Sequence, residues 1–594
     1  MDSIPHLTEL LRTNDPPPEP AVYAATRIRL KSMEDLLQIE ADIELLKEKR
    51  NHIQNSIDTC NAILSPLRRL PMDILSEIFY HCMPTDRNPI MSATEAPMLL
   101  TRVSSLWRSI AFSSPRIWAK LHIPFPGDPT LSTCFGALKD EMLATRRQVF
   151  AKVIEHRCQV VKEWLHRSGT CPLSISLHYP TGYIPSLDNA YNSREGVDVT
   201  ADPLFLLVLS FSRRWKQLDL TLPFSIYQKL DSYMSRDTLP ILQTFRAVAH
   251  WQSVMETESV PELIRPPITF MGAPNLQQLY LHSRELSDET ARFPSTIWNR
   301  LTDLCFISPI SEVNFYNLIK HCHNLITCEV EIEDPLNNEQ EPFQPRIHVA
   351  FPVKMLKVKL QAHYADPPTD IFESIYFPSL ESMHYRCPPR YHEFIPGQPP
   401  TLIPSRSFLD IIENAPSTIR KLNIDPRNLG PEDPLTCLRL TSEITHLSLG
   451  VAPGFYHVNT EEDMFPADYL DFNIFAIGTG CEDILVPKLE VLQMHDLQGL
   501  TDETIFRVLI SRVDAAQRGD VSPLRHVKMQ ISRQRQKDIR EAVLEQAKSA
   551  GFEMKLELHY APDGSPYKGR LSPSFSLPPA DFSSLPKIWP PDWE

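Results

Sequence analysis

The sequence predicts an α/β protein in three parts: a long N-terminal helix, a small all-α unit, and an irregular α/β solenoid of strand–helix repeats. Three observations support this fold class. Apolar residues recur at helical spacing near the N-terminus, a short apolar stripe follows between Leu64 and Met83, and a strand-like pattern then recurs along the chain. Because 594 residues are too many for one compact core, several domains or an elongated array are expected.

The composition is that of a folded protein and disfavours two functional classes, general nucleic-acid binders and glycine-rich nucleotide-binding proteins. Apolar residues make up 42% of the chain and charged residues 22%, which is ordinary for folded proteins. The net charge of −15 disfavours a general nucleic-acid binder, which needs a basic surface. With 55 prolines and only 17 glycines, the chain is also unlike the glycine-rich architectures that bind nucleotides.

The first twenty residues lack the basic and apolar regions of a secretory signal. Apolar runs such as Phe205–Phe211 are too short to span a bilayer. We therefore expect no membrane association, a cytoplasmic and/or nuclear location, and cysteines in the reduced state.

A coiled-coil-like helix is predicted over residues 27–64, after a flexible leader over 1–26. Its seam positions alternate three and four residues apart over four heptads, and Arg50 alone among them is charged. These positions are Leu36, Ile39, Ile43, Leu46, Arg50, Ile53, Ile57, Cys60 and Leu64. Two interpretations stay open: the helix lies back on the next domain, or the chain self-associates through residues 30–64.

Residues 65–123 predict a unit of three short helices. The first carries an apolar stripe of Ile74, Leu75, Ile78 and Phe79, and it follows a proline at a position where proline is tolerated. A second stripe contains Val103, Leu106, Trp107 and Ile110. So small a unit exposes much of its surface and often needs a partner to cover it.

The residues of this unit resemble an F-box, and most closely the F-box proteins of mushroom-forming fungi. The family pattern is Leu-Pro, an acidic residue, an Ile/Leu pair and Ile-Phe, then, after a gap, Val-Ser/Cys-x-x-Trp-Arg and a final Trp. The matching residues are Leu70, Pro71, Asp73, Ile74, Leu75, Ile78, Phe79, Val103, Ser104, Trp107, Arg108 and Trp118. The segment His81–Pro97 lengthens the link between the first two helices, as is typical of the fungal group.

The resemblance implies that this unit docks on a Skp-type adaptor and through it on a cullin. In such a helix-in-groove contact a few apolar residues carry most of the energy. The adaptor-binding residues implied by the resemblance are Leu70, Pro71, Ile74, Leu75, Ile78, Phe79, Val103, Trp107 and Trp118. The alternative role for these side chains is the core of the three-helix unit itself.

A degenerate leucine-rich-repeat solenoid is predicted over 170–562, after a helical connector over 124–169. Eleven strings share the pattern apolar-x-x-apolar-x-apolar, and helical stripes lie between several of them, as in 314–324, 407–417 and 503–513. The central apolar positions are Leu218, Phe245, Leu279, Leu304, Cys328, Val358, Met383, Leu422, Leu447, Leu492 and Val527. The alternative is an ordinary α/β domain whose strands share this short pattern.

Four insertions interrupt the array, at 178–203, 331–348, 386–406 and 450–487. They carry aromatic, histidine and acidic residues, and loops on a rigid scaffold are the usual place for recognition. We expect the target site there or on the strand face. The Pro/Ser-rich tail over 563–594 is expected to be disordered or to lie along the solenoid.

Sequence motifs for catalysis or cofactor binding are absent. The chain has no phosphate-binding glycine loop, no H-E-x-x-H and no G-x-S-x-G. The string His321–Cys328 lacks the paired spacing of zinc sites, and Leu325, Cys328 and Val330 fit strand core positions instead. Cys60 and Cys82 are predicted to be buried small apolar residues rather than nucleophiles. No catalytic residue, metal or cofactor is predicted, so the chain is not expected to be an enzyme.

These observations favour a substrate-recognition subunit of a cullin–RING (SCF-type) ubiquitin ligase. Its expected partners are a Skp-type adaptor, a cullin through that adaptor, and a target protein of unknown identity. The alternative function is a non-catalytic protein-interaction scaffold that does not act in ubiquitination.

Overall fold

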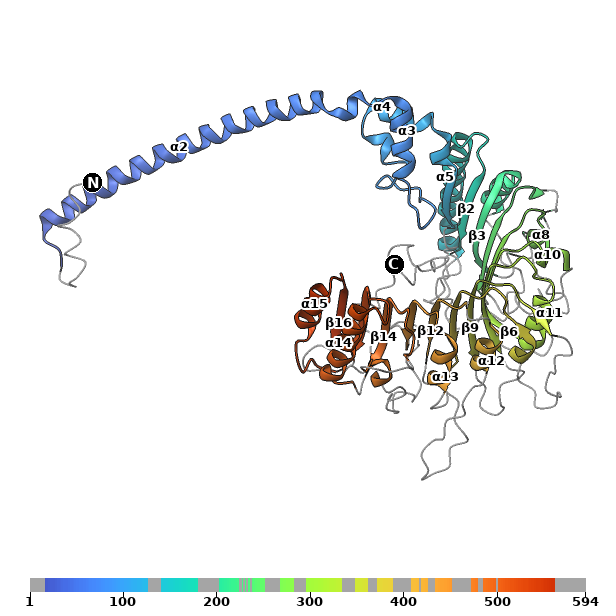
Figure 1. The fold of residues 1–594 in the computed structure, drawn as a ribbon. Coiled ribbons are helices and arrows are strands. Elements are labelled where there is room, and N and C mark those ends of the chain that lie inside the picture. The colour runs from blue at the N-terminus through green and yellow to red at the C-terminus, as the bar shows by residue number, and fades with distance from the viewer. Residues whose placement is uncertain are drawn as a thin grey trace. The chain divides into compact units, whose positions relative to one another are not determined.

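The fold of the described residues is mixed α/β, as predicted, with a long N-terminal helix and a large parallel sheet (Figure 1). The computed structural model describes residues 16–125, 140–179, 202–223, 238–250, 268–282, 295–333, 348–361, 371–387, 407–415, 418–425, 433–450, 472–478, 484–497, 500–531 and 533–560, together with Tyr227, Leu230, Tyr233 and Met234. The four predicted insertions lie largely outside these residues, and the predicted tail lies wholly outside them. The chain divides into two compact units, residues 1–79 and 80–594.

The first unit contains helix α2 (Glu19–Leu64), a 3-10 turn (η2, Pro66–Arg69) and most of helix α3 (Met72–His81). Helix α2 begins eight residues before the predicted position 27, and Pro20 lies in its first turn, where a missing N–H costs nothing. It ends at Leu64 because Ser65 precedes Pro66, and a residue before proline disfavours the helical conformation. None of its 46 residues is buried.

The second unit is built on one sheet of fourteen parallel strands, in which every strand pairs with its neighbour in chain order. The strands are β1 (Lys120–Pro124), β2 (Leu173–His178), β3 (Trp215–Pro223), β4 (Thr244–His250), β5 (Gln278–His282), β6 (Asp303–Ser311), β7 (Thr327–Glu333), β9 (Met355–Gln361), β11 (Ser382–Arg386), β12 (Lys421–Ile424), β13 (His446–Leu449), β14 (Val491–Leu497), β15 (His526–Ile531) and β16 (Lys555–Tyr560). Two further strands, β8 (Val349–Ala350) and β10 (Ile375–Tyr376), form a separate parallel pair.

Strand pairing aligns ten of the eleven predicted central positions in one continuous row. The exception is Val358, because Leu356 pairs with Cys328 and Met383 in its place. Val358 lies two residues further along the same strand face and is buried in a second apolar row, opposite Val330. The central row also continues beyond the prediction, through Leu121, Ile175 and Leu556.

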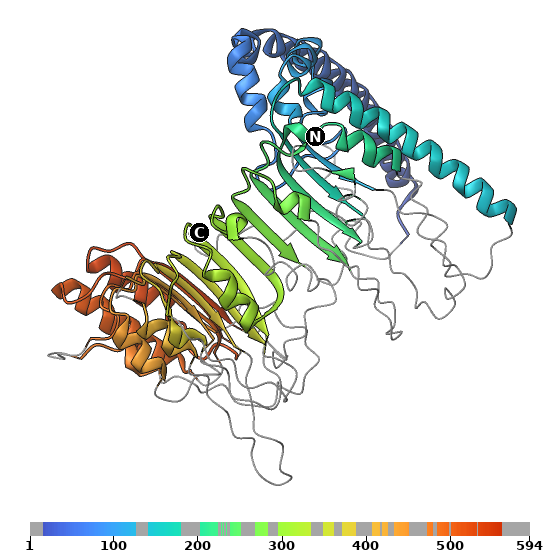
Figure 2. The same cartoon turned by 90° about the vertical axis from the view of Figure 1, so that its right-hand side faces the viewer.

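Helices connect the strands and lie along one face of the sheet (Figure 1 and Figure 2). The helices of this unit are α4 (Ser105–Phe112), α5 (Asp140–Arg167), α6 (Asp202–Leu209), α8 (Ile268–Met271), α10 (Ser295–Trp298), α11 (Glu312–Ile319), α12 (Ser407–Glu413), α13 (Asp433–Leu440), α14 (Asp502–Arg518) and α15 (Arg540–Ser549). The three predicted helical stripes overlap α11, α12 and α14. The bounds of helix α14 follow from its sequence. Thr501 caps its first turn, and Gly519 adopts the left-handed conformation at its end.

Strand β1 begins at Lys120, inside the segment 65–123 that the sequence assigns to the small helical unit. Leu121 and Ile123, two residues apart, are fully buried, which is the period of a strand with one apolar face. The sheet therefore starts immediately after the last short helix, η4 (Pro115–Trp118), with one residue between them.

The central row predicts where the sheet is most sensitive to substitution. Leu447 is fully buried and pairs with Leu422 and Leu492, so Leu447→Ala should cost about 2–5 kcal/mol through lost contacts and a residual cavity. Amide hydrogen exchange should then accelerate in β12, β13 and β14. Leu440→Ala, at an exposed position on α13, is the matched control and should leave exchange unchanged. Equal effects of the two changes would contradict this role of the row.

Candidate functional site

The predicted adaptor-binding residues of the first unit divide into buried and exposed side chains. Leu75 and Phe79 are 1% and 0% exposed, so they pack as core residues, and their contact with a partner stays a prediction. Ile74 is 46% exposed and Pro71 is exposed, while Leu70 and Ile78 are half-buried. Positions 71, 74 and 78 are three and four residues apart, the spacing of one helix face.

Helix α4 presents a similar division in the second unit. Val103 is 56% exposed, Leu106 is exposed, Trp107 is half-buried, and Ile110 is buried. The serine of the motif Val-Ser-x-x-Trp has a structural role. The Ser104 hydroxyl caps the helix by accepting a hydrogen bond from the Trp107 backbone amide at 3.2 Å. Cap and stripe together place Val103 and Leu106 at the exposed start of this helix.

Trp118, the final tryptophan of the pattern, is wholly buried, and its contact with a partner stays a prediction. Its indole Nε1 donates to the Ala111 carbonyl at 2.7 Å, and its ring meets Trp164 of α5 edge to face at 4.9 Å. The Arg167 guanidinium lies 5.0 Å from the centre of the same ring. Trp118 therefore joins the end of the helical segment 80–118 to α5 and the sheet.

The inserted segment His81–Pro97 is fixed to the first strands of the sheet. The Arg87 guanidinium binds Glu95 through two hydrogen bonds of 3.0 and 2.5 Å. The Asn88 amide donates to Ser176 Oγ at 3.2 Å and its oxygen accepts from Ser174 Oγ at 2.9 Å. The insertion is thus a strap that ties residues 80–118 to β2.

Several exposed apolar residues near the predicted site were missed by sequence reasoning. In the first unit they are Leu67 and Met72, and in the second they are Leu99 and Phe112. Each lies near a residue of the family pattern in the sequence, and that neighbourhood is the signal that could have found them. Groups of exposed apolar side chains are typical of protein-interaction surfaces.

The face of the sheet opposite the central row carries a second aligned row, which we call the polar row. It contains His122, Ser176, Asp219, Arg246, Tyr280, Cys305, Glu329, Lys357, His384, Asn423, Ser448, Gln493, Lys528 and Glu557. Neighbouring members pair by charge: Asp219 lies 3.5 Å from Arg246 and Glu329 lies 3.9 Å from Lys357. None of these side chains is fully exposed: six are buried and eight are half-buried, so only the half-buried ones can reach a bound protein. The buried six are His122, Ser176, Arg246, Tyr280, Cys305 and Ser448.

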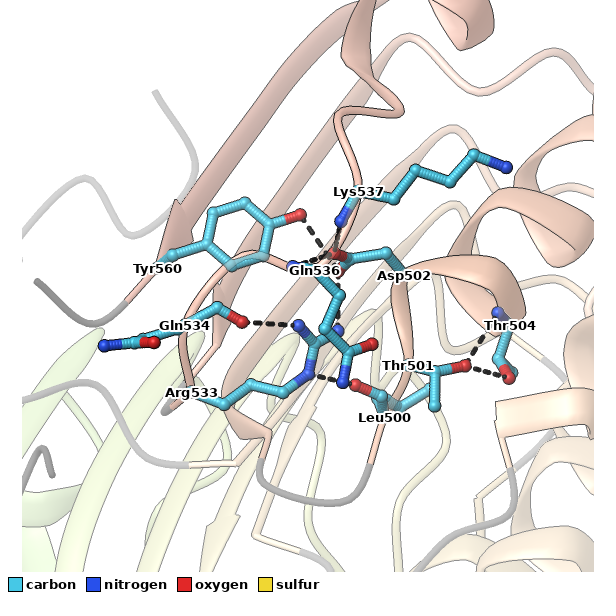
Figure 3. A network of polar contacts seen from close by, with 9 residues as sticks. All are labelled: Leu500, Thr501, Asp502, Thr504, Arg533, Gln534, Gln536, Lys537 and Tyr560. Carbon is cyan, nitrogen blue, oxygen red and sulfur yellow. Dashed lines mark hydrogen bonds and ion pairs between the residues drawn. The ribbon is translucent and has the colours of Figure 1, made fainter. Parts of the chain in front are cut away.

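A network of polar contacts surrounds Asp502, the first residue of α14 (Figure 3). Its carboxylate accepts hydrogen bonds from Arg533 at 2.6 Å, from the Gln536 and Lys537 amides at 2.7 Å each, and from the Tyr560 hydroxyl at 3.2 Å. Burial alone would raise the pKa of Asp502, but the bonds from Arg533 and the two amides outweigh it and lower that pKa. A carboxylate engaged by four donors is a structural clamp rather than a catalytic base.

Of the cysteine and histidine residues at 321–328, only Cys328 lies in a strand, β7, while His321, Cys322 and His323 lie between the end of α11 at Ile319 and the start of β7 at Thr327. Leu325, Cys328 and Val330 are buried core residues, and burial raises the pKa of the Cys322 thiol to about 12. Cys60 and Cys82 contradict their prediction, because both are exposed. Among the residues described, no group of three or more His, Cys, Asp or Glu side chains is arranged to hold a metal ion.

No protein-family model matches the chain, and no curated protein shows significant similarity to it. Within the described part of the chain, no helix combines the length and the apolar character that crossing a bilayer requires.

We expect the stability of the first strands of the sheet to depend on pH through His122. Burial, and then the neighbouring His178, lower the pKa of His122 to about 4 from its ordinary 6.5. Between pH 6.5 and 4 the unfolded chain therefore binds a proton that the folded chain does not, so the free energy of unfolding falls as the pH falls through this window, by about 2.5 kcal/mol at pH 4.5. Hydrogen exchange of β1 and β2, corrected for intrinsic rates, should show this loss. His122→Asn keeps a donor near Ser176 without titrating, and an unchanged pH dependence in that variant would contradict the assignment.

We expect the Asp502 carboxylate to stabilise the C-terminal end of the sheet. Asp502→Asn puts an amide donor where four donors converge and should cost about 2–4 kcal/mol at neutral pH. Because the folded pKa of Asp502 is depressed, its contribution is complete above the ordinary aspartate range and disappears as the pH falls through the lowered pKa. Faster exchange in β15, α15 and β16 is the expected readout. Asp538→Asn, in an exposed ion pair with Arg535, is the control and should have no effect.

Proposed function

We propose that this chain is the substrate-recognition subunit of an SCF-type cullin–RING ubiquitin ligase. Residues 65–118 would be an F-box that docks on a Skp-type adaptor, and residues 120–560 a degenerate leucine-rich-repeat solenoid that binds a target protein. The observation that carries the proposal is the ordered match of twelve residues, from Leu70 to Trp118, to the F-box pattern.

The burial of these residues supports a docking role for part of the pattern. Leu75, Phe79 and Trp118 are internal, which the unit needs in order to fold. Pro71, Ile74 and Val103 remain exposed although they are apolar, and Leu67, Met72 and Leu106 are exposed near them in sequence. Side chains of this kind gain most when the groove of a partner removes them from water.

The sheet supports a repeat solenoid as the target-binding part. Its strands follow one another in chain order, all pairs are parallel, and one central apolar row runs through them in register. This is the arrangement in which each strand–helix unit contacts only its neighbours. On the face away from the central row, the half-buried members of the polar row, such as Asp219, Glu329 and Lys357, would offer the target charged side chains.

The mechanism is positioning rather than catalysis by this chain. The adaptor and cullin would bring a ubiquitin-conjugating enzyme, and the array would hold lysines of the target near its activated thioester, which raises their effective concentration. Residues 80–118 belong to the same compact unit as the array, and the Trp118–Trp164 contact and the strap bind them to the sheet. A target on the array would therefore keep a defined distance from this half of the F-box.

Direct binding to a purified Skp-type adaptor, measured by calorimetry, tests the proposal. The wild type should bind with micromolar or tighter affinity, and Ile74→Asp combined with Val103→Asp should weaken binding at least about 30-fold, because both changes place a charge in an apolar contact. Both positions are exposed, so the variant should keep the wild-type circular dichroism spectrum. Leu440→Asp, at an exposed apolar position of α13, is the matched control.

A folded wild type that does not bind the adaptor would contradict the proposal. So would a double variant that binds as tightly as Leu440→Asp. In either case a repeat scaffold with another partner becomes the better description.

A further inference from the structure

Helix α2 concentrates exposed apolar surface to a degree that a solvated helix does not need. Fourteen of the thirty large hydrophobic side chains that are exposed in the described residues lie on this one helix, and eight of the nine predicted seam positions are exposed apolar residues if Cys60 is counted with them. The helix is about 69 Å long at 1.5 Å per residue. Helices of this length are normally stabilised by packing an apolar face.

The charges beside the seam indicate what covers it. Residues 34–44 carry five acidic residues and no basic ones, whereas Lys47, Lys49 and Arg50 follow directly. Two parallel copies in register would put Arg50 opposite Arg50 inside the seam, and Asp35 beside the partner's Glu40. The same register would also place Asp42 beside the partner's Lys47, an attraction that offsets the Asp35–Glu40 repulsion. The two Arg50 side chains inside the seam are left uncompensated, so parallel self-pairing is disfavoured.

Antiparallel pairing of the same two helices reverses these contacts. The acidic block then lies against the basic block of the second copy, at both ends of the overlap because of the two-fold symmetry. We propose that α2 forms an antiparallel coiled coil with α2 of a second copy of this chain, centred between Glu44 and Leu45. This pairing goes beyond the proposed ligase function and does not depend on it.

The register follows from the seam and from its flanking charges. With this centre, Leu36 packs opposite the partner's Ile53, and Ile43 opposite the partner's Leu46. Glu40 flanks the partner's Lys47, and Asp42 flanks the partner's Lys49. All four kinds of contact occur twice, and each is attractive.

Arg50 and the alternative register support the same choice. In the proposed register Arg50 meets the partner's Ile39 and lies near the acidic residues on either side of it, so its charge is offset at the edge of the seam. Moving the centre to residue 48 would pack more apolar layers, but Lys47 would face the partner's Lys47 and Lys49 the partner's Lys49. Six positive charges would then meet at the centre, Arg50 included.

Sedimentation equilibrium of the full chain tests the pairing with one variant that should weaken the dimer and a second change that should restore it. The wild type should dimerise, and Glu40→Lys should weaken the dimer about five- to tenfold, because two attractive contacts become repulsive. Adding Lys47→Glu should restore the affinity to within about twofold. Glu48→Lys makes the same charge change on the outer side of the helix, away from the seam, and should change nothing.

Three results would overturn the proposal. A wild type that stays monomeric at a concentration of about 100 μM would mean that another surface or protein covers α2. A tighter dimer for Glu40→Lys would indicate parallel pairing, since the introduced lysine would then attract the partner's Asp35. Equal weakening by Glu40→Lys and Glu48→Lys would show that the flanking contacts have no part in association.

Disulfide mapping tests the register independently, because the exposed Cys60 lies on the seam. In the proposed dimer Cys60 packs opposite the partner's Arg29, so Arg29→Cys should yield a disulfide between residues 29 and 60 under mild oxidation, identified by peptide mass spectrometry. These positions are about 46 Å apart within one helix, so the bond must join two chains. A bond between two Cys60 residues, or no bond at all in a dimeric protein, would contradict the register.

Discussion

Each strand of the large sheet, from Lys120 to Tyr560, leaves an apolar row on the side where the connecting helices lie, and no strand–helix unit can bury that row alone. Parallel pairing in register buries the row, because each of its side chains lies beside that of the next strand. Leu218 pairs with Phe245, Phe245 pairs with Leu279, and the row continues to Leu556. Inserted loops of very different length can be accommodated, since only the strand and one helix of each unit must fit their neighbours. The polar row on the opposite face is a by-product of the same alternation.

The end of this stack is protected by the helical segment that precedes β1. Trp118 packs on Trp164, and the strap from His81 to Pro97 reaches β2 through Asn88. An exposed sheet edge is a hazard in a parallel array, and covering it is the usual remedy. Here the cover is also part of the proposed docking domain, so under that proposal the same contacts would serve both stability and the placement of a target.

Much of the fold could be predicted from the sequence, because its signal is local and repeated. Ten central positions follow from the spacing of apolar residues alone. Val358 was misplaced because apolar residues alternate at 356, 358 and 360, so a shift of two residues keeps the same face and only the neighbouring strands decide the register. The strand at 120–124 was missed because it follows the last tryptophan of the F-box pattern almost without a break.

Burial within the docking region could not be read from residue types. Ile74 and Leu75 are adjacent and chemically alike, yet one is exposed and the other is core, because neighbouring elements choose the face. Cys60 was expected to be buried as cysteines usually are, but none of α2 is. The Asp502 clamp had no sequence signal, because Arg533 and Tyr560 lie 31 and 58 residues away along the chain.

The proposed role of this chain is to link an adaptor-bound cullin to a target. Size-exclusion chromatography with light scattering, on a mixture of the full chain, a Skp-type adaptor and a cullin, tests it most directly. The expected result is one species that contains all three proteins in equal amounts and that is lost without the adaptor. Elution of the chain apart from both proteins, or with the adaptor while the cullin is excluded, would contradict this role.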